Sequence, residues 1–152
     1  MSHPKNPVPS FSRRLLVLVL WLIAAHSIGF GVSLIVLPCH IIELFGFTIS
    51  EKFFAVQGGV FHLIISYAYI SAALDPERSK PMIILSCITK FSATLFLFGY
   101  YWIVKPITMV LLAGIMDGLM GLSVLLLYLI FTGWPRKWRL QITGTEKGMG
   151  GK

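Results

Sequence analysis

Residues 107–132 read ITMVLLAGIMDGLMGLSVLLLYLIFT, and this stretch decides the fold of the chain. Its only charged residue is Asp117; every other position is apolar, small or a hydroxyl residue. At about 1.5 Å per residue, a helix of this length reaches about 39 Å, which exceeds the roughly 30 Å of a bilayer's hydrocarbon core. A run this long with so little charge is typical of a membrane-spanning helix.

Three further apolar blocks precede this one. The four predicted spans cover residues 15–37, 53–74, 82–104 and 107–132. A membrane β-barrel would instead show alternating segments of about ten residues, which the sequence lacks. The predicted fold class is therefore all-α, an integral membrane four-helix bundle. A helix makes its backbone hydrogen bonds within one segment, so it can span a bilayer, whereas β-strands can do so only in a closed barrel.

The connections between the blocks predict how the spans are arranged. The links at 75–81 and at Lys105–Pro106 are short, so neighbouring spans should pack as antiparallel hairpins. In the longer connection, Thr48-Ile49-Ser50-Glu51 matches a capping box and predicts that the second helix begins before its apolar block. Outside the bundle at 15–132, we expect a flexible arm at 1–14 and a basic tail at 133–152.

The placement of charge predicts the orientation. The chain has 13 lysines and arginines, 6 acidic residues and a net charge of +7. Ten of these cations fall on one side of the predicted spans: Lys5, Arg13, Arg14, Arg78, Lys80, Arg136, Lys137, Arg139, Lys147 and Lys152. Only Lys52 and Lys105 fall on the other side, so the positive-inside rule predicts that both termini are cytoplasmic.

This topology also explains the basic surplus, and we predict no nucleic-acid partner. The predicted partner is the lipid bilayer, with a homo-oligomer or a membrane protein complex as a further expectation. Arg136, Lys137 and Arg139 lie among Trp134 and Trp138, and we expect this segment to contact anionic lipid at the inner surface.

Four ionisable residues fall inside the spans, where charge is costly and usually faces the bundle interior. Counted from the cytoplasmic end of each span, their depths are about 12 to 22 Å. These residues are His26, His62, Lys90 and Asp117. All four depths lie in one central slab of the bilayer, which makes these residues the candidate site, with Gln57 nearby toward the outer side.

Small residues indicate which helix faces turn inward. Gly114, Gly118 and Gly121 share one helix face with Asp117, and glycines there let another helix approach closely. In the first span, Ala25, Gly29 and Ser33 form a ridge beside His26, which predicts that this ridge is a packing face. Gly58 and Ser66 share a face with His62, and Ser86 and Ala93 share one with Lys90. Four polar faces are thus expected to converge.

Three interpretations of this slab remain open. Lys90 and Asp117 could form a structural ion pair, although their predicted depths differ by about 10 Å and require helix tilt or a bridging water. The same residues could bind a ligand or relay protons. His26 and His62, at nearly equal depth on consecutive spans, could instead hold a b-type haem or border a quinone site.

Motifs of soluble enzymes are absent from the sequence, including the phosphate-binding loop, G-x-S-x-G and HExxH. Cys39 and Cys87 are expected at different depths, too far apart for a disulfide, and they cannot form a metal site by themselves. We therefore predict no catalytic residues, no metal site and no firmly assigned cofactor, and whether the protein is an enzyme is left open.

A family resemblance is spread over residues 15–132. It is carried by Leu37-Pro38, by ELFGF at 43–47, by Gln57-Gly58-Gly59 and by Asp75-Pro76. In these features the chain resembles small bacterial four-helix membrane proteins, the DoxX-like group and related uncharacterised families. The resemblance implies a membrane subunit or accessory protein of the bacterial inner membrane, in some members tied to quinone-linked redox chemistry.

The leading functional hypothesis is an accessory or ligand-binding membrane protein whose polar cluster lies at mid-bilayer. The second hypothesis is a membrane redox subunit that binds haem or quinone near His26 and His62. The third is a proton-coupled transporter or small channel that acts as an oligomer and uses Asp117 and Lys90 as the relay, because four helices are few for a complete transport path.

Overall fold

The computed structural model describes residues 10–49 and 51–133, and it confirms the all-α fold. Its helices are α1 (Ser10–Val36), α2 (Cys39–Glu43), α3 (Phe53–Leu74), α4 (Lys80–Ile103) and α5 (Thr108–Thr132). Four of them, all but the short α2, are long and apolar enough to cross a membrane, so the chain is a multi-pass membrane protein. The predicted lipid-surface residues Arg136, Lys137 and Arg139 lie outside the described residues.

The helix limits agree with the apolar blocks to within two residues, except at the start of α1. α1 begins at Ser10 rather than Leu15, so the last residues of the predicted arm are helical. The capping-box prediction was wrong, because α3 begins at Phe53 with Lys52 as its N-cap and no side-chain capping bond. The short helix α2, in the connection before α3, was not predicted at all.

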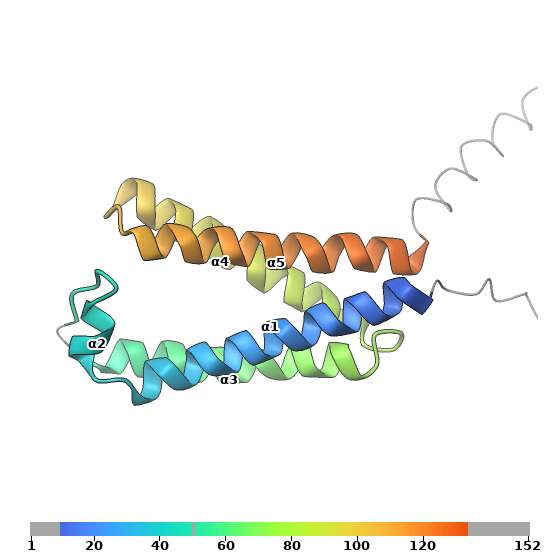
Figure 1. The fold of residues 1–152 in the computed structure, drawn as a ribbon, viewed down its shortest axis with the longest axis horizontal. Helices are drawn as coiled ribbons and strands as arrows, with labels where there is room; N and C mark the ends of the chain where they lie inside the picture. Colours follow the sequence, from blue (N-terminus) through green and yellow to red (C-terminus); the bar gives the residue numbers. More distant parts are fainter. Residues whose placement is uncertain (1–9, 50, 134–152) are drawn as a thin grey trace, which may run out of the picture.

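The four long helices form two antiparallel hairpins, α1 with α3 and α4 with α5 (Figure 1). In the first hairpin, a Cβ added to Gly31 would lie 2.8 Å from the carbonyl oxygen of Gly59, so the two backbones touch. In the second, a Cβ added to Gly114 would lie 2.8 Å from the Phe98 ring, and Gly118 faces Thr94. Small residues therefore set the close approach within each hairpin.

The two hairpins pack against each other at one end only. We call this the basal end, where α1 begins and α5 ends (Figure 1). The hydrophobic core cluster lies in the basal half: Leu16, Leu20, Ile23, Ala24, Tyr69, Ala72, Ala73, Ile83, Val124 and Phe131. Toward the opposite end, which carries α2, the hairpins diverge (Figure 1). The core therefore forms a base from which the two hairpins extend.

At the α2 end the segment after α2 links the two hairpins. Gly46, with φ of +92°, carries the chain through a tight turn beside Ile107. Its carbonyl oxygen accepts a hydrogen bond of 3.4 Å from the Lys105 ammonium group. At this end the first hairpin thus contacts the second through a loop and not through packed helices.

We expect Gly46→Ala to lower the free energy of unfolding by about 1 kcal/mol or more, because an L residue is strained at this positive φ and its Cβ would lie 3.1 Å from Ile107. Thermal unfolding in detergent measures the change. Gly99→Ala is the control, since an added Cβ there meets no atom within 4 Å. Equal melting temperatures for the two variants would contradict the proposed turn.

Candidate functional site

Lys90 of α4 and Asp117 of α5 form a direct ion pair. The Lys90 Nζ lies 2.5 Å from the Asp117 Oδ1, and the two side chains are 4% and 13% exposed. The contact is direct, so the bridging water that the predicted depths allowed for is not needed. Both charges are removed from lipid and neutralise each other, which is how intramembrane charges are usually tolerated.

Glycines place the pair in register. A Cβ added to Gly121 would lie 3.0 Å from the Cβ of Lys90, so these two residues are level with each other. Asp117 lies one helical turn further toward the α2 end, and the lysine stem can extend over one turn. The glycine face predicted from the sequence is therefore confirmed. This register and the length of the lysine side chain together close the predicted depth gap.

Tyr69 of α3 connects this pair to the first hairpin. Its ring centroid lies 5.8 Å from the Lys90 Nζ, within cation–π range. The side chain is 1% exposed and belongs to the buried core. Sequence analysis missed this residue, although Tyr69 lies seven positions after His62 and three after Ser66, on the same helix face. The pair thus lies at the edge of the core, where the hairpins begin to diverge.

His62 of α3 is held by Ser27 of α1. The Ser27 hydroxyl donates to the His62 carbonyl oxygen at 3.0 Å and lies 3.2 Å from the imidazole Nδ1. The Ser27 hydroxyl has one proton, and it donates this proton to the carbonyl oxygen. The His62 Nδ1 must therefore carry a proton and donate it to the Ser27 Oγ, which leaves the His62 Nε2 as a hydrogen-bond acceptor. Ser27 is fully buried, which fixes the ring's position.

The His26, Phe30 and His62 rings form one row. Phe30 stacks on His26 with centroids 6.3 Å apart, and it meets His62 edge-on at 4.9 Å. His26 shares a face of α1 with Ile23, which is buried in the core. This face therefore turns toward the other helices, yet His26 and Phe30 are exposed, because the hairpins have diverged at their level.

His62 lies two helical turns before Tyr69 on one face of α3, and Tyr69 contacts Lys90, so the row of rings and the ion pair lie in the same region of the bundle. The predicted packing ridge beside His26 was wrong. Ala25 and Gly29 are exposed, and an added Cβ at Gly29 meets no atom within 4 Å. The face that packs on α3 instead carries Ser27 and Gly31.

Gln57 is not brought to this region. It is exposed, and the neighbours on its helix face, Phe54 and Phe61, are 71% and 60% exposed. Among the described residues its side chain makes no hydrogen bond to another residue. This predicted site residue therefore faces away from the cluster.

The row of rings does not suit a haem held by two imidazoles. Such a haem needs both histidines to face one iron across the plane of the macrocycle. Here the Phe30 ring contacts both imidazoles, and the His62 Nδ1 is turned to Ser27. The described residues also contain no group of three or more His, Cys, Asp or Glu residues that could hold a metal ion.

The fold and site define a class, an all-α multi-pass membrane protein with a buried ion pair and, near it, two imidazoles of which one is exposed and the other half-buried. Comparison with known families, curated proteins and solved structures found no match to this chain.

Proposed function

We propose that this protein is an accessory membrane protein that binds a small organic ligand between its two hairpins, beside His26 and His62. The observation that carries the proposal is the exposure of His26 one turn after the buried Ile23, on the same face of α1. A polar ring uncovered inside a bilayer lacks hydrogen-bond partners, so a ligand there would gain contacts that lipid cannot provide.

The charges and the rings indicate the chemistry of the ligand. Lys90 and Asp117 neutralise each other, so this pair gives the site no net charge that would attract an ion. An imidazole offers one donor and one acceptor, and Phe30 adds an apolar ring between the two histidines. A neutral molecule with one hydrogen-bonding group and an apolar body matches these surroundings. It would enter from the bilayer, where the hairpins diverge.

The orientation belongs to the same proposal. Arg13, Arg14, Arg78 and Lys80 lie at the basal end, whereas Lys52 and Lys105 lie at the α2 end. The positive-inside rule supports a cytoplasmic basal end. The ligand would then reach His26 from the outer half of the bilayer.

We expect His26→Leu to lower the amount of co-purified ligand at least tenfold, because it removes the hydrogen-bonding group and leaves the exposed position apolar. Organic molecules released from the heat-denatured protein are compared by mass spectrometry, and bulk lipids are subtracted. Ile28→Leu is the control, since Ile28 lies on the opposite face of α1. If wild type and His26→Leu release the same species in equal amounts, the proposal is wrong.

A further inference from the structure

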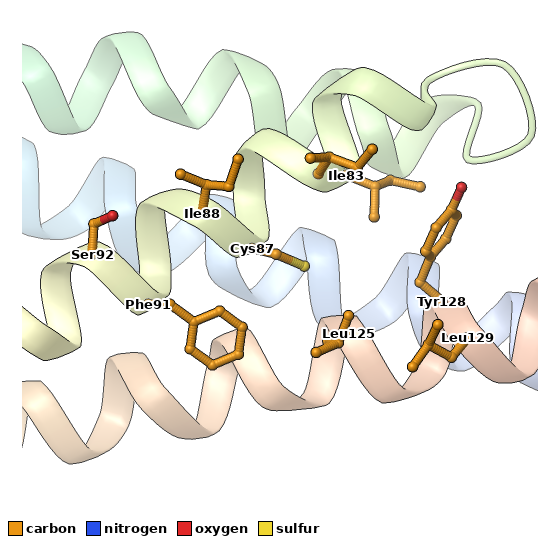
Figure 2. A pocket seen from close by; sticks show the side chains of 9 residues that line it. Ile83, Cys87, Ile88, Phe91, Ser92, Leu125, Tyr128 and Leu129 are labelled. Carbon is orange, nitrogen blue, oxygen red and sulfur yellow. The ribbon is translucent and has the colours of Figure 1, made fainter.

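A second feature, separate from the polar cluster, is an apolar groove between α4 and α5. Its volume is about 510 Å³, and its lining includes Ile83, Cys87, Phe91, Leu125 and Tyr128. Figure 2 shows Cys87 and Phe91 reaching from α4 toward α5, and Tyr128 reaching from α5 toward α4. The lining is almost entirely apolar, so the groove suits a hydrocarbon chain.

The extent of the groove matches one leaflet of a bilayer. Along α4 its lining runs from Ile83 to Ser92, which corresponds to about 14 Å of helix. Half of the hydrocarbon core is about 15 Å thick. An acyl chain that enters at the basal end would therefore occupy the whole groove without passing the middle of the bilayer.

The basal end of the groove carries polar and cationic groups. Lys80 precedes Ile84 by four residues and thus lies on the face of α4 that lines the groove. Lys80 is exposed, and among the described residues no ion pair involves it. The Tyr128 side chain lines the same end, about 6 Å from the end of α5, at the depth where tyrosine hydroxyls meet the lipid interface.

A second copy of the chain fits this surface less well. Copies inserted the same way are related by an axis along the membrane normal, and such an axis brings equal depths together. Lys80 would then approach Lys80 of the other copy at the same depth, where the like charges repel.

From these observations we infer that the groove binds one anionic phospholipid, with an acyl chain between α4 and α5 and the phosphate beside Lys80. Each lysine near the surface favours anionic lipid by about 1 kcal/mol, which corresponds to about a fivefold preference. The inference does not depend on the proposed ligand near His26, because none of the groove-lining residues belongs to that site.

Native mass spectrometry of the full chain, titrated with phosphatidylglycerol or phosphatidylcholine, tests the inference. We expect wild type to retain one phosphatidylglycerol with about a fivefold preference over phosphatidylcholine. Lys80→Gln should bring this ratio close to one, whereas Lys52→Gln, at the α2 end, should leave it unchanged. Because Lys80 is exposed, this variant tests the charge without disturbing the core.

Leu125→Trp fills the groove and should remove the retained lipid of either kind. Leu126→Trp is the matched control, since the next residue is 50% exposed and does not line the groove. Equal retention of the two lipids by wild type would overturn the inference, and so would an unchanged ratio in Lys80→Gln. A lipid-free dimer that Leu125→Trp dissociates would also overturn it, because the groove would then be an interface between copies.

Discussion

Gly31→Ala is expected to lower the free energy of unfolding by about 3 kcal/mol, whereas Gly29→Ala, two residues away on the same helix, should not lower it. A Cβ at Gly31 would lie 2.8 Å from the Gly59 carbonyl oxygen and 3.1 Å from the His62 Cβ. The first neighbour is backbone and cannot rotate away, so α1 and α3 must separate, and overpacking of this kind costs about 1–3 kcal/mol or more.

At Gly29 an added Cβ meets no atom within 4 Å. The only expected effect there is the better helix propensity of alanine, a gain of up to about 1 kcal/mol. Gly59→Ala should reproduce the loss from the other side of the contact, since its Cβ would lie 2.6 Å from the Gly31 carbonyl oxygen. The double variant should lose less than the sum of the two, because one helix separation relieves both contacts.

Titration of detergent micelles with sodium dodecyl sulfate, followed by circular dichroism, measures these free energies. The melting temperature of Gly31→Ala should fall by about 10 °C. If the two alanine variants of α1 have equal stability, α1 and α3 do not meet at Gly31.

The long helices could be predicted because bilayer thickness sets a minimum length for an apolar block. α3 begins and ends where its block does, at Phe53 and Leu74. It could also be predicted that the face of α5 with Asp117 packs against another helix, since three glycines on that face allow close approach. These features depend on composition along a single helix, which the sequence contains.

The packing face of α1 could not be predicted in the same way. Ala24, Ser27 and Gly31 form a small-residue ridge as good as the one through Gly29, and only the partner helix decides between them. Polarity gives no help, because a membrane helix is apolar on its lipid face as well as on its packing face. The divergence of the hairpins was also not predictable, since it depends on packing between helices distant in the sequence.

Asp117→Leu is expected to destabilise the protein by about 3–5 kcal/mol. Lys90 is 3% exposed, and the substitution removes the partner that lies 2.5 Å from its ammonium group; an unpaired buried charge carries a penalty of this size. Lys90→Met should cost about as much, because it leaves the Asp117 carboxylate unpaired. Arg78→Leu is the control. Its partner is Asp75, but the arginine side chain is 90% exposed, so the change should be barely measurable.

The double variant Lys90→Met/Asp117→Leu shows whether the single variants are unstable because they leave one charge unpaired. Apolar side chains of similar volume replace both ions and leave nothing unpaired, so the double variant should recover to within about 1 kcal/mol of wild type. The same titration with dodecyl sulfate measures all three variants. A double variant as unstable as either single variant would mean that the two side chains stabilise the bundle separately, through contacts such as that of Lys90 with the Tyr69 ring. Recovery of stability together with loss of the ligand that depends on His26 would instead show that the pair is needed for ligand binding and not for the stability of the fold.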